Sequence, residues 1–253
     1  MLVDAGNFAE LKPPHPWEKT TFVFDVMAGL GYDVVTPGDS ELRPGIDSLR
    51  ALVARHPEVR MVSANLKSKS GAYVFPQFTV IEKNGIRFGV TGTTGPEYYQ
   101  QNVRQALQSE DDFTFEDSKT ALERVVPQLR AQADVVVVLL NEMVDSAMKL
   151  TTAVPGIDVA VAGHDPGVLP APEKLGDAIF IRPGNRGQYV YRVPLVLDPA
   201  SKRVSGYAGR ALMLDALMAK DADTDSTVVR WEKGFKDRYN QPVPYVKPVP
   251  AGQ

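Results

Sequence analysis

The chain has 253 residues, 43% hydrophobic and 23% charged, and its length suits one large α/β domain or two small ones. These proportions exclude a chain that is disordered throughout. With 28 Lys and Arg against 31 Asp and Glu, the formal charge is -3, which excludes a global basic field for holding nucleic acid or an anionic membrane.

Strands and helices alternate in the first part of the chain, a pattern typical of a layered α/β domain. We expect strands at 1–4, 33–36 and 60–64 and helices at 17–30 and 46–55. Gly31 follows the first helix at the position where glycine commonly ends one. Segments 78–82 and 86–91, joined by Asn84 and Gly85, predict a hairpin because Asn-Gly suits the mirror-image tight turn. Parallel and antiparallel pairing should therefore coexist.

The second part predicts a helix at 117–133, kinked or opened at Pro127, a buried strand at 134–140, a helix at 143–151 and a strand at 157–162. Segments 178–182, 189–197 and 207–213 are interpreted as a late antiparallel group, and a polar helix follows at 221–239. No composition break divides residues 1–215. We therefore expect one domain over 1–215, a C-terminal helix within 216–240 and a Pro-rich tail or linker over 241–253.

Several kinds of chemistry are excluded by residue type. Without cysteine there is no disulfide, thiolate metal site or cysteine nucleophile, and only His15, His56 and His164 supply imidazole. The apolar run 135–140 is far shorter than the roughly 20 residues of a membrane-spanning helix. The first residues lack the basic and apolar regions of a secretory signal. We therefore expect no membrane-spanning helix and no secretory signal in this sequence.

Four segments stand at the carboxyl ends of apolar strands, where open α/β sheets place their ligands. Each is a common turn sequence by itself, so their order and spacing carry the argument. They occupy residues 4–7, 38–41, 141–142 and 163–166.

In this order, the segments resemble the metallophosphoesterase domain of the 5'-nucleotidase type, in the calcineurin-like superfamily. The resemblance covers about residues 1 to 200 and implies a layered β-sandwich flanked by helices (α/β/β/α), with mixed parallel and antiparallel sheets. The corresponding stretches are Asp4-Ala5-Gly6-Asn7, Gly31-Tyr32-Asp33 with Gly38-Asp39-Ser40-Glu41, Ser63-Ala64-Asn65, Val138-Leu139-Leu140-Asn141, Ala162-Gly163-His164-Asp165-Pro166 and Gly184-Asn185-Arg186-Gly187.

The resemblance implies two divalent metals, bridged by a carboxylate, that activate a water and hold the phosphoryl oxygens. This chain departs from the family at the ligand positions. Asn7 replaces the bridging Asp, Ser40 replaces a His that supports the phosphate, and Asn141 and Pro166 replace ligand His residues. The family's first Asp-x-His motif belongs on a strand before residue 1. A dinuclear centre is therefore not expected.

At the ligand positions only His164 is kept, with Asp39 beside it as a substitute for the family's Asn. Together with the two amides, this set could form at best a weak mononuclear site for Mn, Zn or Mg. Structural roles are the alternative. His164 would then hydrogen-bond the backbone, Asp39 and Ser40 would form a turn or N-cap, and Glu142 would begin a helix.

A second candidate is the loop that contains Arg182, Asn185 and Arg186, since two arginines in a glycine-rich backbone could bind an anion such as phosphate. The alternative is a tight connection between strands.

These patterns favour a non-catalytic binding or scaffold module with the phosphoesterase fold and no expected cofactor. Its partner would be a protein, a neighbouring domain or a phosphate-containing ligand. The alternative is an active metal-dependent phosphohydrolase of nucleotides or related phosphate esters. The resemblance also implies a periplasmic or exported compartment.

Overall fold

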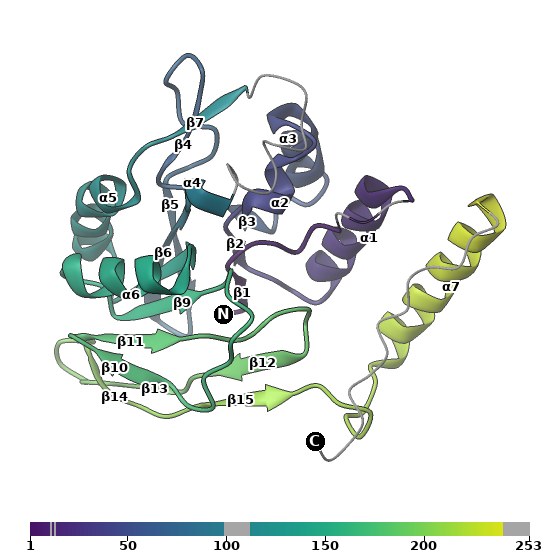
Figure 1. The fold of residues 1–253 in the computed structure, drawn as a ribbon. Coiled ribbons are helices and arrows are strands. Elements are labelled where there is room, and N and C mark those ends of the chain that lie inside the picture. The colour runs from purple at the N-terminus through teal and green to yellow at the C-terminus, as the bar shows by residue number, and fades with distance from the viewer. Residues whose placement is uncertain (11, 13, 99–111, 240–253) are drawn as a thin grey trace.

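The computed structural model describes residues 1–10, 12, 14–98 and 112–239 (Figure 1). Two sheets build the body. The smaller has the order β1-β2-β3, with parallel pairing throughout. Its strands are short and follow one another in the chain: β1 (Val3–Asp4), β2 (Val34–Val35) and β3 (Arg60–Met61).

The larger sheet has the order β10-β11-β9-β8-β6-β5. Its four inner strands are parallel, and β10 and β5 pair antiparallel at the edges. The central strand at 135–141 is buried along its whole length and apolar up to Leu140, as expected for a strand covered on both faces. The strands are β5 (Phe78–Lys83), β6 (Ile86–Thr94), β8 (Val135–Asn141), β9 (Val159–Ala162), β10 (Glu173–Leu175) and β11 (Ala178–Ile181).

Three apolar clusters show how the layers pack. One joins the large sheet to α5 (Ser118–Gln132) and α6 (Val144–Ala153), and a second joins the small sheet to α1 (Pro16–Gly29) and α3 (Ile46–Ala54). The third contains Val34 and Val62 together with Val90 and Leu139, so the two sheets face each other. This is the predicted α/β/β/α arrangement with mixed pairing, and the fold class is confirmed.

The hairpin β5–β6 confirms its predicted turn, because Asn84 and Gly85 have φ of 54° and 75°, as a mirror-image turn requires. Helix α5 continues through Pro127.

The late strands differ from the prediction. β11 pairs parallel with β9 inside the large sheet. Segment 189–197 is divided before Pro194 into β12 (Tyr189–Arg192) and β13 (Leu195–Leu197).

Two further ribbons are antiparallel, as predicted for this part of the chain. β12 pairs with β15 (Arg210–Met213), and β13 pairs with β14 (Val204–Tyr207). Their inner side chains pack on the core between the sheets. Several short elements were not predicted, because each offers too few residues for a periodic signal. They include β10 as well as β4 (Leu66–Ser68), β7 (Phe113–Phe115) and α4 (Pro96–Tyr98).

The predicted C-terminal helix is present as α7 (Ala222–Tyr239), which lies beside α1 and away from the sheets (Figure 1). The expected tail at 241–253 lies outside the described residues.

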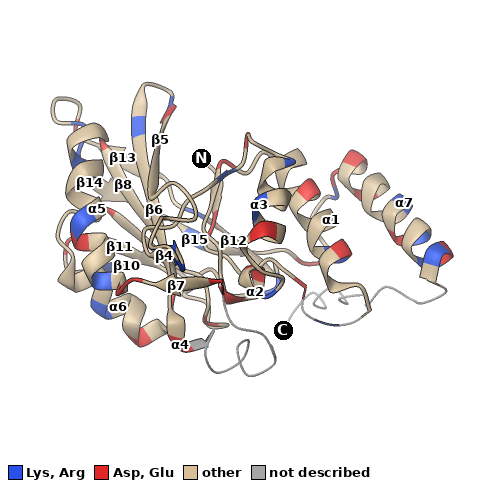
Figure 2. Ribbon diagram, turned by 90° about the horizontal axis from the view of Figure 1, so that it is seen from above, with Lys and Arg blue, Asp and Glu red and all other residues tan. Residues whose placement is uncertain are grey.

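Acidic and basic segments are interspersed on α5 and α7 (Figure 2). None of the described helices is both long and apolar enough to cross a membrane.

Candidate functional site

The segments 4–7, 38–41, 141–142 and 163–166, which we call the loop cluster, meet at the carboxyl ends of β1, β2, β8 and β9. Asn141 Nδ2 donates to the carbonyl oxygen of Ala5 at 2.8 Å. A Cβ on Gly38 would lie 1.9 Å from Asn7 Oδ1 and 2.7 Å from Asn141 Nδ2. Glycine at this position therefore lets the two amide side chains approach the same turn.

His164, in the fourth segment of the cluster, contacts Asp39 in the second. Its Nε2 lies 2.9 Å from Asp39 Oδ1, and the two side chains are only 13% and 7% exposed. Burial alone would raise the pKa of Asp39, but hydrogen bonds from His164 and Asn7 and the electrostatic attraction of His164 outweigh it and hold that pKa below its usual value. The two residues best suited to bind a metal ion therefore contact each other.

The carboxylate of Glu41 organises the cluster. It accepts backbone hydrogen bonds from Asn7 at 2.8 Å, Ala9 at 2.6 Å and Gly38 at 2.7 Å, and one from Ser40 Oγ at 3.0 Å. Burial raises its pKa, although these four donors oppose the shift. The motif predicted at 38–41 gives Glu41 no role of its own. Its position three residues after Gly38 is a capping signal at the start of α2 (Asp39–Leu42).

Asn7 stands where the resemblance predicts a bridging carboxylate. Its backbone has φ of 66°, a left-handed conformation that Asn tolerates. Its Oδ1 accepts from the backbone N–H of Ser40 at 3.3 Å and from Ser40 Oγ at 3.2 Å. The amide thus serves the local hydrogen-bond network and carries no negative charge.

Asp4 is a further carboxyl group of the cluster, in its first segment. Removal from water raises its pKa to about 7, and the nearby Glu41 adds to the shift, while the N–H of Gly6 opposes it. That N–H donates to Asp4 Oδ1 at 2.8 Å.

This donor set does not fit a dinuclear metal centre. Asn141 is 1% exposed, and its Oδ1 has no hydrogen-bond partner among the described residues, but it is a neutral acceptor. Pro166 is exposed and offers no side-chain ligand. Within the described part of the chain, no group of three or more His, Asp or Glu side chains is arranged to hold an ion. Two divalent cations need several anionic or imidazole ligands that this cluster lacks.

Two expected local roles are wrong. Gly38, not Asp39, is the N-cap of α2. Glu142 does not begin a helix, since α6 starts at Val144. Instead its carboxylate is 2% exposed and accepts from Thr93 Oγ1 at 2.8 Å and Ser118 Oγ at 2.6 Å. Burial raises the pKa of Glu142 to about 7 despite these hydrogen bonds, and Glu97 and Asp117 add to the rise.

The glycine-rich loop contacts the loop cluster through Arg182. Arg182 forms an ion pair with Asp165, so its charge is already balanced. Its Nε is buried without a partner among the described residues. Asn185 and Arg186 are exposed, and Arg186 has φ of 58°. The structure therefore brings Arg182 to the 163–166 segment and leaves the other two in solvent.

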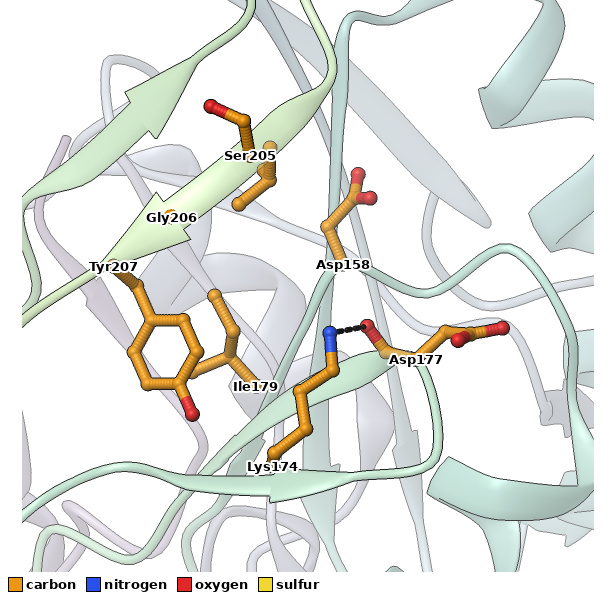
Figure 3. A pocket seen from close by; sticks show the side chains of 8 residues that line it. Asp158, Lys174, Asp177, Ile179, Ser205, Gly206 and Tyr207 are labelled. Atoms are coloured by element: carbon orange, nitrogen blue, oxygen red, sulfur yellow. Dashed lines mark hydrogen bonds between the residues drawn. The ribbon is translucent and has the colours of Figure 1, made fainter.

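A cavity of about 300 Å³ lies elsewhere, between the β10–β11 hairpin and β14 (Figure 3). Lys174 Nζ donates to the backbone carbonyl of Asp177 at 3.0 Å on its wall. The ring of Tyr207 and the side chain of Ile179 form its apolar side. None of its lining residues belongs to the loop cluster.

Comparisons with known proteins agree with the fold described above. No protein-family model matches the chain. It is 26% identical over 214 residues to the trifunctional nucleotide phosphoesterase protein YfkN of Bacillus subtilis. The match covers 72% of this chain and 14% of that protein. It is 25% identical over 260 residues to 5'-nucleotidase of Rattus norvegicus, covering 91% of the chain and 43% of the relative. The chain thus spans less than half the length of these two relatives.

Solved structures share the fold. The sulfate thiohydrolase SoxB of Thermus thermophilus superposes with a TM-score of 0.81 at 18% identity, covering 94% of this chain and 43% of that one. The calcineurin-like phosphoesterase YfkN of Bacillus subtilis superposes with a TM-score of 0.79 at 20% identity, covering 95% of this chain and 85% of that one. The chain is thus similar in sequence to a nucleotide phosphoesterase and a 5'-nucleotidase, and it shares the fold of a calcineurin-like phosphoesterase.

Proposed function

We propose that this phosphoesterase-type domain lacks a dinuclear metal centre and acts as a non-catalytic binding or scaffold module. The observation that supports this most directly is the contact between Asp39 and His164. A carboxylate and an imidazole that bond each other are not free to bind two metal ions. Asn7, Ser40 and Asn141 add only neutral groups, and Pro166 adds none.

The energetics support the same conclusion. Metal-dependent hydrolysis relies on a bound water whose pKa falls from about 15.7 to about 7. In the loop cluster, the carboxylate of Glu41 is already occupied by four donors. The described side chains of the cluster can supply no comparable acidification, so a domain without the metals would lose most of the rate acceleration of hydrolysis.

The test is an assay of the purified full chain with an aryl phosphate and with nucleoside monophosphates, in Mn²⁺, Zn²⁺ or Mg²⁺. We expect turnover equal to the blank, and the same result for His164→Ala. Metal-stimulated turnover that His164→Ala abolishes would overturn the proposal.

The second candidate is an active metal-dependent phosphohydrolase of nucleotides or related phosphate esters. It is favoured by the similarity to YfkN, a nucleotide phosphoesterase by name. Asp39 and His164 would have to separate to bind a single ion. The same assay distinguishes the candidates, because this one predicts turnover that saturates with metal and falls in both His164→Ala and Asp39→Asn.

A further inference from the structure

The β12–β15 ribbon presents an outer face with an unusual composition. Along β12, Tyr191 packs inward on the core between the sheets, whereas Val190 and Arg192 are exposed. The Cα partners of these two exposed residues on β15 are Leu212 and Arg210. Directly paired residues lie on the same face of an antiparallel ribbon. Both pairs therefore lie on the outer face.

Apolar side chains continue along this face from the valine–leucine pair. Leu214 lies two residues beyond Leu212 on the same face and donates its N–H to the carbonyl of Gln188. The following turn carries Leu217 and Met218, which are 79% and 49% exposed. Isolated exposed apolar residues are ordinary, but a run of them marks an interaction surface. We call this set the apolar stripe: Val190, Leu212, Leu214, Leu217 and Met218.

Two positive charges stand at one end of the stripe. Arg192 and Arg210 are direct cross-strand neighbours, an arrangement that is destabilising for like charges. Neither guanidinium has an ion-pair or hydrogen-bond partner in the described part of the chain. Several other arginines are paired with acids. They include Arg87 with Asp134, Arg124 with Glu116 and Arg130 with Asp158.

We propose that the outer face of the β12–β15 ribbon binds an acidic, apolar segment of a partner protein. Its carboxylates would pair with Arg192 and Arg210, which relieves their mutual repulsion, and its apolar side chains would cover the stripe. Charge complementarity selects this occupant. A second copy of the chain would bring the same positive charges to the interface. An anionic membrane is typically held by clusters of 4–8 basic residues, and this face has two.

The proposed surface consists of the β12–β15 ribbon and the turn that follows it. None of its residues belongs to the loop cluster, so partner binding and catalysis can fail independently. A hydrolytically active chain could still bind the partner, and an inactive chain could lack the docking surface.

The test uses a short fluorescent peptide in which aspartate alternates with leucine, titrated with the full chain and followed by anisotropy. We expect saturable binding that weakens with salt. Arg192→Ala or Arg210→Ala should each weaken it by about fivefold or more, the effect of losing more than about 1 kcal/mol. The double variant Arg192→Glu with Arg210→Glu should instead prefer the matching peptide with lysine in place of aspartate.

Arg203→Ala is the matched control, because this exposed arginine lies in the turn between β13 and β14, outside the ribbon. It should leave the affinity unchanged, and circular dichroism should show every variant folded. The proposal is overturned if the aspartate peptide does not bind or if both peptides bind equally. Unchanged affinity in the arginine variants would also overturn it. Binding to phosphatidylglycerol vesicles instead, or self-association lost in those variants, would assign the face to a membrane or to a second copy.

Discussion

Glu41 shows how single residues hold the loop cluster together. It is fully buried and accepts hydrogen bonds from three backbone N–H groups, two of which lie more than thirty residues away in the chain. A buried donor that loses its acceptor keeps its full desolvation cost. The carboxylate therefore joins the end of β1 to the start of α2.

Replacement of Glu41 tests this role. Glu41→Ala should lower the free energy of unfolding by about 3 kcal/mol or more, since each orphaned buried donor costs about 1–3 kcal/mol. Glu41→Gln retains one acceptor oxygen and should lose less. Urea unfolding of the two variants measures the difference, and an Ala variant as stable as the unmodified chain would refute the role.

Glu142 gives a pH-dependent prediction. Its pKa is raised from 4.5 to about 7 in the folded chain, so unfolding releases its proton between these values. Its contribution to stability is therefore complete below pH 4.5 and is lost as the pH rises to about 7, on the order of 3 kcal/mol in total. Glu142→Gln should have a flatter stability profile in urea unfolding over this range. Identical slopes for the two proteins would contradict the shift.

The motif order was enough to place Asn7, Asp39, Asn141 and His164 at strand ends, and the structure brings them together. It was not enough for Glu142, whose hydroxyl partners Thr93 and Ser118 lie 49 and 24 residues away. Local propensity favours a carboxylate at a helix start. Tertiary burial overrides that preference, and no pattern within the segment signals it.

At the scale of elements, α7 is attached by aromatic side chains. The rings of Trp231 and Phe22 stack with centroids 4.3 Å apart, and Tyr239 stacks on His15 at 3.6 Å. Phe235 between them is fully buried, although most of the helix is polar and only this residue of it is buried among the described residues. The attachment to α1 thus depends on one face of one helix.

Phe235→Ala should detach α7 while the sheets stay folded. Burial of a phenylalanine is worth roughly 3–5 kcal/mol against alanine, which exceeds what a polar helix can retain by itself. Hydrogen exchange of residues 222–239 should accelerate strongly, with little change in the main thermal transition. Val229→Ala, at a position 56% exposed, is the control and should alter neither. Loss of the main transition in Phe235→Ala would show that α7 belongs to the core.

Elements with a local signal were predicted well. The β5–β6 hairpin needs only Asn84, Gly85 and alternating neighbours. Pairing partners were harder to predict. Nothing near residues 178–182 distinguishes an antiparallel neighbour from the parallel partner β9, because the choice depends on packing of the whole sheet.

At the scale of the whole molecule, three apolar clusters join four layers, and the loop cluster is closed by hydrogen bonds. A ligand that binds only the folded state would stabilise it in proportion to its occupancy. Because we propose that no metal pair closes these loops, EDTA should leave the thermal unfolding temperature unchanged. A fall in this temperature that added Mn²⁺ or Zn²⁺ reverses would argue for a structural metal.

The most direct measurement is the metal content of the purified chain after incubation with excess Mn²⁺ or Zn²⁺ and gel filtration, determined by elemental analysis. The Asp39–His164 contact and the neutral side chains of Asn7 and Asn141 predict less than one retained ion per chain. Two tightly held ions per chain, lost together in His164→Ala, would contradict the account.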